Sequence, residues 1–166
     1  MNLGEINFLF TFNYWTRDRI LEQAARLSTG QYLEPQAYGH GSLRNELVHI
    51  LGAEWIWRVR CQEQRSPTSL LQFKDFPTVE HLQIQWQREE KNMRAYLGSL
   101  TDKALEELVT YRRTGGETRK NVLWHLLLHI VNHGTEHRSQ AAAELTAKGC
   151  SPGDIDLIHF LRAINA

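Results

Sequence analysis

The chain has 166 residues, of which 42% are hydrophobic and 23% are charged, as in an average soluble globular protein. This length predicts a single domain over residues 1–166 that buries a core without disulfides. Nineteen basic side chains balance nineteen acidic ones, which argues against nucleic acid as a partner. No run approaches the roughly 18 apolar residues of a membrane helix. The first residues lack the basic start of a secretory signal, and the two cysteines form no paired motif, so we expect a cytoplasmic protein.

Apolar residues recur at helical spacing along most of the chain, and no segment shows sustained strand alternation. Four long helices are predicted at about residues 3–27, 42–62, 78–100 and 120–148, with Ser42 and Thr78 as N-caps. Shorter elements are predicted at 101–108 (helix), 111–119 (turn or hairpin) and 154–164 (helix). A long connection separates the second and third long helices. The fold class is therefore predicted to be all-α, a four-helix bundle.

Two polar residues, Asn13 and Arg17, interrupt the apolar stripe of the first helix. Burying such a group without a partner costs about 2–7 kcal/mol, so each needs one. Both are candidates for a ligand pocket, and the alternative is a buried structural contact. For Arg17, the partner in that case would be Glu89 or Glu90 on the third long helix.

The opposite side of the first helix carries three large aromatic residues, Phe8, Phe12 and Trp15. Exposed together, they would approach the largest apolar patch that a monomer usually carries. A homodimer contact through this face would cover them. The alternative is cover by the 29–41 connection or the C-terminal segment of the same chain.

Four histidines, His125, His129, His133 and His137, follow one another at four-residue steps on the last long helix. Each step turns by about 40° around the helix axis, so the four cannot all face inward. The apolar stripe is centred near Ile130, and His137 and His133 lie closest to that centre. These two form the inward pair, within joint reach of one metal ion.

A third ligand should come from another helix, and His49 in the apolar second helix is the best candidate. A lone buried histidine is more often a core residue satisfied by one hydrogen bond, but the inward pair of His133 and His137 favours a metal ligand at His49. Three neutral imidazoles suit Zn²⁺, Ni²⁺, Co²⁺ or Fe²⁺ and leave positions open for water or substrate. Gln140 points near the inward face and is a candidate for substrate contact. Arg138 is expected to be structural, and His40 to be an ordinary loop residue.

The segment from His129 to Gln140, HIVNHGTEHRSQ, resembles the NHxxxHRGQ signature of the DinB/YfiT-like family. The surroundings of His49, the start of the first helix at 13–21 and the segment at 149–156 are also similar to that family, so the resemblance covers nearly the whole chain. It implies a four-helix bundle of DinB/YfiT type, a divalent metal on His49, His133 and His137, and often a homodimer. Ser139 stands where the family usually has glycine.

Some members of this family use low-molecular-weight thiols such as bacillithiol or mycothiol, and a thiolate suits an open metal position. The resemblance thus implies a metal-dependent thiol S-transferase or hydrolase that acts on a small molecule. The alternative is a noncatalytic metal-binding, stress-linked protein. Whether the chain is an enzyme is left open by the sequence.

The same residues also match the H-x-x-E-H pattern of inverted zinc peptidases, from His133 to His137, with Glu136 as general base. Such peptidases are much larger and take a distant downstream glutamate as a ligand. Here Glu144, on the same helix, is the sole glutamate after His137. We therefore expect Glu136 to be a solvated charge or to support a ligand.

Overall fold

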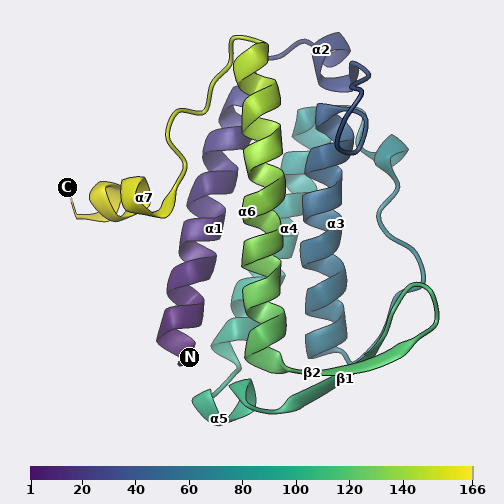
Figure 1. The fold of residues 1–166 in the computed structure, drawn as a ribbon, viewed down its shortest axis with the longest axis vertical. Coiled ribbons are helices and arrows are strands. Elements are labelled where there is room, and N and C mark those ends of the chain that lie inside the picture. Colours follow the sequence, from purple (N-terminus) through teal and green to yellow (C-terminus); the bar gives the residue numbers. More distant parts are fainter. Residues whose placement is uncertain (166) are drawn as a thin grey trace.

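A computed structural model describes residues 1–165, and most of them lie in helices, which confirms the prediction of a mainly helical chain. Four long helices lie side by side (Figure 1): α1 (Leu3–Ala24), α3 (Leu43–Gln62), α4 (Val79–Gly98) and α6 (Leu123–Ala147). Helices α1 and α3 each contact both α4 and α6. Among the described residues, no helix is both long enough and apolar enough to cross a bilayer.

The starts of the long helices follow the predicted capping signals. The Ser42 side chain accepts a hydrogen bond from the Asn45 amide, and the Thr78 side chain accepts one from the His81 amide. Each cap satisfies an amide that has no partner inside the helix. The long connection between α3 and α4 is also present and holds one 3₁₀ turn, η1 (Phe73–Asp75).

Several shorter elements differ from the prediction. Helix α2 (Thr29–Leu33) was not expected; Ser28 and Gln31 form a capping box that starts it. The predicted hairpin is present but longer than expected: strands β1 (Leu108–Arg112) and β2 (Thr118–Val122) pair antiparallel, so α6 begins after them rather than at residue 120. Helices α5 (Asp102–Leu105) and α7 (Leu157–Ile164) are shorter than predicted.

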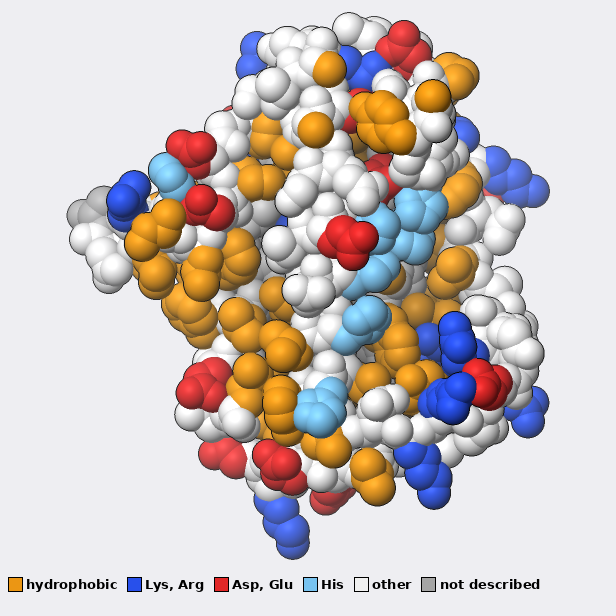
Figure 2. All heavy atoms as spheres, viewed as in Figure 1, with side chains coloured by type: hydrophobic (Ala, Val, Ile, Leu, Met, Phe, Trp, Pro, Cys, Tyr) orange, Lys and Arg blue, Asp and Glu red, His pale blue; other side chains and the backbone are white. Residues whose placement is uncertain are grey.

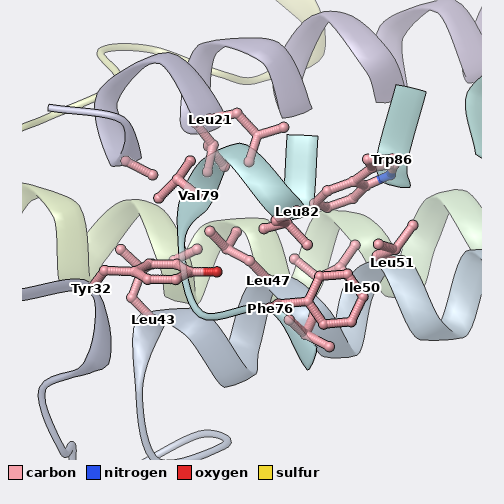
Figure 3. Packing of buried hydrophobic residues seen from close by; sticks show 14 of the residues in the cluster. Leu21, Tyr32, Leu43, Leu47, Ile50, Leu51, Phe76, Val79, Leu82 and Trp86 are labelled. Atoms are coloured by element: carbon pink, nitrogen blue, oxygen red, sulfur yellow. The ribbon is translucent and has the colours of Figure 1, made fainter. Parts of the chain in front are cut away.

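The buried apolar side chains form two clusters that hold the helices together. Figure 3 shows the first cluster, in which Trp86 and Leu82 of α4 pack against Leu47 and Leu51 of α3. The second cluster joins α1, α4 and α6 and includes Ile130, at the centre of the predicted apolar stripe. The two clusters thereby fix the histidine-bearing face of α3 and that of α6 at the edge of the core.

The aromatic face of α1 is covered within the chain. Phe160 of α7 lies with its ring centroid 5.6 Å from those of Phe8, Phe12 and Trp15. Phe160 is 2% exposed and Phe12 is 7% exposed. This is cover by the C-terminal segment, the alternative to a second copy that the sequence left open, so the aromatic face of α1 gives no reason for a dimer. The homodimer itself stays a prediction.

Candidate metal centre

Histidine side chains gather along one face of the molecule, over α6 and towards α3 (Figure 2). The ring centroids of His49 and His133 lie 4.9 Å apart, those of His49 and His137 4.6 Å, and those of His133 and His137 4.4 Å. The three histidines predicted as ligands thus come together from two helices. His125 and His129, the other two members of the four-residue series, are exposed.

The spacing of the imidazole nitrogens fits a transition metal. The Nε2 atoms of His49 and His133 lie 3.1 Å apart. Ligand nitrogens at about 2.0–2.1 Å from one ion lie roughly 2.9–3.4 Å apart in octahedral or tetrahedral geometry. One nitrogen each of His40, His49 and His137 also lies within 4.8 Å of the others. The donor set is therefore suited to Zn²⁺ or a similar divalent ion.

A buried carboxylate, Glu46, orients two of these rings. Its Oε1 atom lies 2.5 Å from Nδ1 of His137, and its Oε2 atom lies 2.9 Å from Nδ1 of His40. An ionised carboxylate can only accept, so each ring donates its Nδ1–H and keeps the Nε2 lone pair. Burial alone would raise the pKa of Glu46, but the hydrogen bonds from His40 and His137 lower it below its ordinary value.

The sequence indicated no role for His40, yet the structure places its ring centroid 3.8 Å from that of His49. The flanking glycines make this possible: Gly39 has φ +59° and Gly41 has φ +87°. A Cβ atom on Gly39 would also lie 2.9 Å from Oε2 of Glu46. The Gly-His-Gly sequence before the α3 N-cap, with Glu46 three residues before His49, is the signal that could have revealed both residues.

The environment keeps two of the rings neutral. Burial, with a smaller effect from neighbouring histidines, lowers the pKa of His49 to about 4 and that of His133 to about 3. A histidine binds a metal through its neutral form. At neutral pH both side chains are therefore in the neutral form that metal binding requires.

A cavity of about 400 Å³ lies beside the histidines. His49 and His133 line it, together with Trp57 and Arg60 of α3 and Tyr111 of β1. A ligand in this cavity can therefore contact the side of the histidine cluster that these two residues form. The cavity makes His49 and His133 accessible to a small molecule.

The sequence model of the DinB family matches residues 3–165. The chain belongs to the DinB family. A comparison with curated proteins finds no match. Membership agrees with the resemblance seen in the HGTEHRSQ segment, and the histidines of that segment are the ones that α6 turns towards α3.

The DinB signature also explains part of the packing around the centre. Arg138 is 1% exposed; it donates one hydrogen bond to the Asn13 side chain and another to Oγ1 of Thr135, 3.2 Å away. A Cβ atom on Gly134 would lie 2.5 Å from Nη1 of Arg138, so glycine leaves room for the guanidinium. Ser139, at the position of the family's glycine, is exposed and donates to the Thr135 carbonyl.

The three pocket candidates lie in different settings. Asn13 is buried and accepts the hydrogen bond from Arg138. Arg17 donates to Asp18 and Glu90, with both ion pairs at 2.6 Å, whereas Glu89 pairs with Arg58. Neither Asn13 nor Arg17 lines the cavity beside the histidines. Gln140 lies next to the loop that carries His40, since its Oε1 atom would be 3.4 Å from a Cβ atom on Gly39.

Proposed function

We propose that this DinB-family chain is a four-helix bundle of DinB/YfiT type that holds a divalent transition metal on His49, His133 and His137. We further propose that it acts as a thiol S-transferase or hydrolase on a small molecule. The observation that carries the proposal is the 3.1 Å approach of the His49 and His133 Nε2 atoms at the wall of a cavity. The proposal includes Zn²⁺, Ni²⁺, Co²⁺ or Fe²⁺ as the metal and a low-molecular-weight thiol of the bacillithiol or mycothiol type.

The chain's own residues have defined tasks in this proposal. A bound metal would supply a Lewis acid that lowers the pKa of a thiol or water. His49 and His133 remain neutral and face the cavity, while Glu46 fixes the ring of His137 through its Nδ1–H. Trp57 and Tyr111 provide apolar walls that limit the access of water to the reacting group.

His40 supports a second candidate function. One of its ring nitrogens lies within 4.8 Å of one nitrogen each of His49 and His137, and Glu46 orients it in the same way as His137. With His133 it would make a set of four imidazoles. Four protein ligands would close a tetrahedral sphere, as in structural metal sites. This arrangement favours the alternative of a noncatalytic, stress-linked metal-binding protein.

The metal assignment is tested with single alanine variants of His49, His133 and His137 and with His125→Ala as the control on the same helix. Each of the three should lose most of its metal, measured by elemental analysis of purified protein, and the control should retain it. Metal loss in His125→Ala with full metal in His137→Ala would contradict the proposal.

The two functions are separated by the Co²⁺-substituted protein. A new thiolate-to-cobalt absorption band on addition of a low-molecular-weight thiol supports an open position and the enzyme. No band in the wild type but a band in His40→Ala supports a sphere closed by His40. Removal of the metal by a chelator should abolish turnover, and re-addition should restore it.

We also propose a cytoplasmic location and a homodimer. Cys61 and Cys150 are both unpaired, which fits a reducing compartment. The dimer proposal now depends on the family resemblance, because α7 covers the aromatic face of α1.

A further inference from the structure

Arg60, in the last turn of α3, is buried and has no acidic partner among residues 1–165. The residue is 5% exposed, and its Nε atom has no hydrogen-bond partner within residues 1–165. Of the three other buried arginines, two are neutralised: Arg17 by Asp18 and Glu90, and Arg58 by Glu89. The third, Arg138, has the neutral partners Asn13 and Thr135. A buried charge without a partner is strongly unfavourable, so the setting of Arg60 requires an explanation.

Aromatic rings hold the Arg60 guanidinium in place. Its central carbon lies 4.7 Å from the ring centroid of Trp57 and 5.5 Å from that of Tyr111. Stacking of this kind keeps the planar group oriented and leaves its edge available for hydrogen bonds. Burial, with a smaller opposing effect from Tyr111 and a further lowering by Arg113, lowers the pKa of Arg60, but an arginine stays charged in proteins.

Arg60 lines the same cavity as the candidate metal ligands. His49, Ala53, Ile56 and Arg60 follow one another at helical spacing and form the α3 wall of this cavity. The hairpin supplies the facing wall, including Arg113, which is largely exposed and pairs with Glu117. Basic side chains lie on the same face as the histidines in Figure 2. A ligand that fills the cavity therefore contacts both a cation and the histidine cluster.

We propose that Arg60 binds a carboxylate of the small-molecule substrate in this cavity. The inference rests on the proposed function only in placing the reacting end of that substrate at His49 and His133. A carboxylate matches the fork of a guanidinium with two parallel hydrogen bonds. One buried cation neutralises one negative charge, which favours a carboxylate over a doubly charged phosphate.

The test uses 4-fluorobenzoate and its neutral analogue 4-fluorobenzamide, with binding followed by fluorine NMR of the ligand. Both are titrated into metal-free and zinc-loaded wild type, Arg60→Gln and the control Arg112→Gln. Arg112 is exposed on β1 next to Arg113 and does not line the cavity, so its removal changes charge alone. Arg60→Met, which keeps an apolar stem against Trp57, is the second variant, and circular dichroism checks that each variant is folded.

The metal-free wild type should bind the benzoate at least about tenfold more tightly than the amide, as expected for a charge-assisted hydrogen bond. Arg60→Gln and Arg60→Met should each lose about tenfold in benzoate affinity, and Arg112→Gln should stay within about twofold. Equal affinity for benzoate and benzamide in the wild type overturns the proposal, whatever the variants do. So does full benzoate affinity in either folded Arg60 variant. Phenyl phosphate bound about tenfold more tightly than benzoate overturns the assignment to carboxylates.

The same titrations separate this inference from the proposed function. Zinc bound at the histidines without any preference for benzoate refutes the role of Arg60 and leaves the metal centre intact. A preference for benzoate that depends on Arg60, in a chain that binds no zinc, supports the anion site and refutes the metal-dependent function.

Discussion

Replacement of Glu46 by glutamine tests the geometry of the candidate metal centre. The carboxylate is 3% exposed and accepts from Nδ1 of both His137 and His40. Glutamine has the same shape but only one acceptor oxygen, so its amide group must face one of the two Nδ1–H groups. That imidazole then loses its hydrogen bond and its fixed orientation. Loss of such a supporting contact typically lowers metal affinity by about 10–100-fold, or roughly 1.4–2.8 kcal/mol.

The assay is competition for Zn²⁺ against a chromophoric chelator at fixed pH. Glu136→Gln is the matched control, because Glu136 is exposed on α6, one residue before His137, and its replacement removes the same charge. The control should bind zinc within about twofold of wild type, as expected for a screened surface charge. Unchanged affinity in Glu46→Gln, or an equal loss in Glu136→Gln, would refute the idea that Glu46 orients the ligands.

Four further predictions concern stability and assembly. Gly134→Ala should lower the free energy of unfolding by about 1–3 kcal/mol, because the added Cβ atom meets the Arg138 guanidinium. The control Ser139→Ala, on the exposed side of α6, should change this free energy by less than about 0.5 kcal/mol. Urea denaturation measures both. The metal-free protein should lose stability as pH falls from about 6.5 towards 4, because the unfolded chain then binds protons that the buried rings of His49 and His133 do not, and an equally steep pH dependence in His133→Asn would count against this cause. Phe160→Ala should lower the free energy of unfolding, measured by the same urea denaturation, by about 3–5 kcal/mol, because Phe160 is buried against three aromatic rings. Sedimentation of the wild type tests the homodimer, and a monomer at high micromolar concentration would contradict it.

Local signals in the sequence predicted the helices and one pair of histidines. Ser42 and Thr78 act within their own first turns, so their capping role is visible without the rest of the chain. The direction of His133 and His137 follows from the apolar stripe of the same helix. Glu89 and Glu90 were the predicted partners of Arg17, and Glu90 is the one of the two that pairs with it.

Contacts between distant segments were beyond this reasoning. The hairpin predicted at 111–119 is present, but strand β2 is mostly polar and exposed, so its full length to Val122 could not be predicted from alternation. The cover of Phe8, Phe12 and Trp15 comes from a helix about 150 residues further along the chain, and nothing in α1 itself distinguishes that cover from a second copy. His40 reaches the centre through two left-handed glycine conformations, which the sequence permits but does not require.

The arrangement of α3 constrains what the cavity can hold. His49 and Arg60 are eleven residues apart, which corresponds to about 16 Å along the helix axis. A molecule that reached the histidines at one end and Arg60 at the other would have to be extended, since a short thiol bound at the histidines would leave the guanidinium without an anion. The aromatic rings of Trp57 and Tyr111 lie between or beside these two ends and would pack against the middle of such a molecule. A substrate with a negative charge at one end and a metal-binding group at the other would therefore fit this cavity. The hairpin that carries Tyr111 would determine how much of that substrate is removed from water.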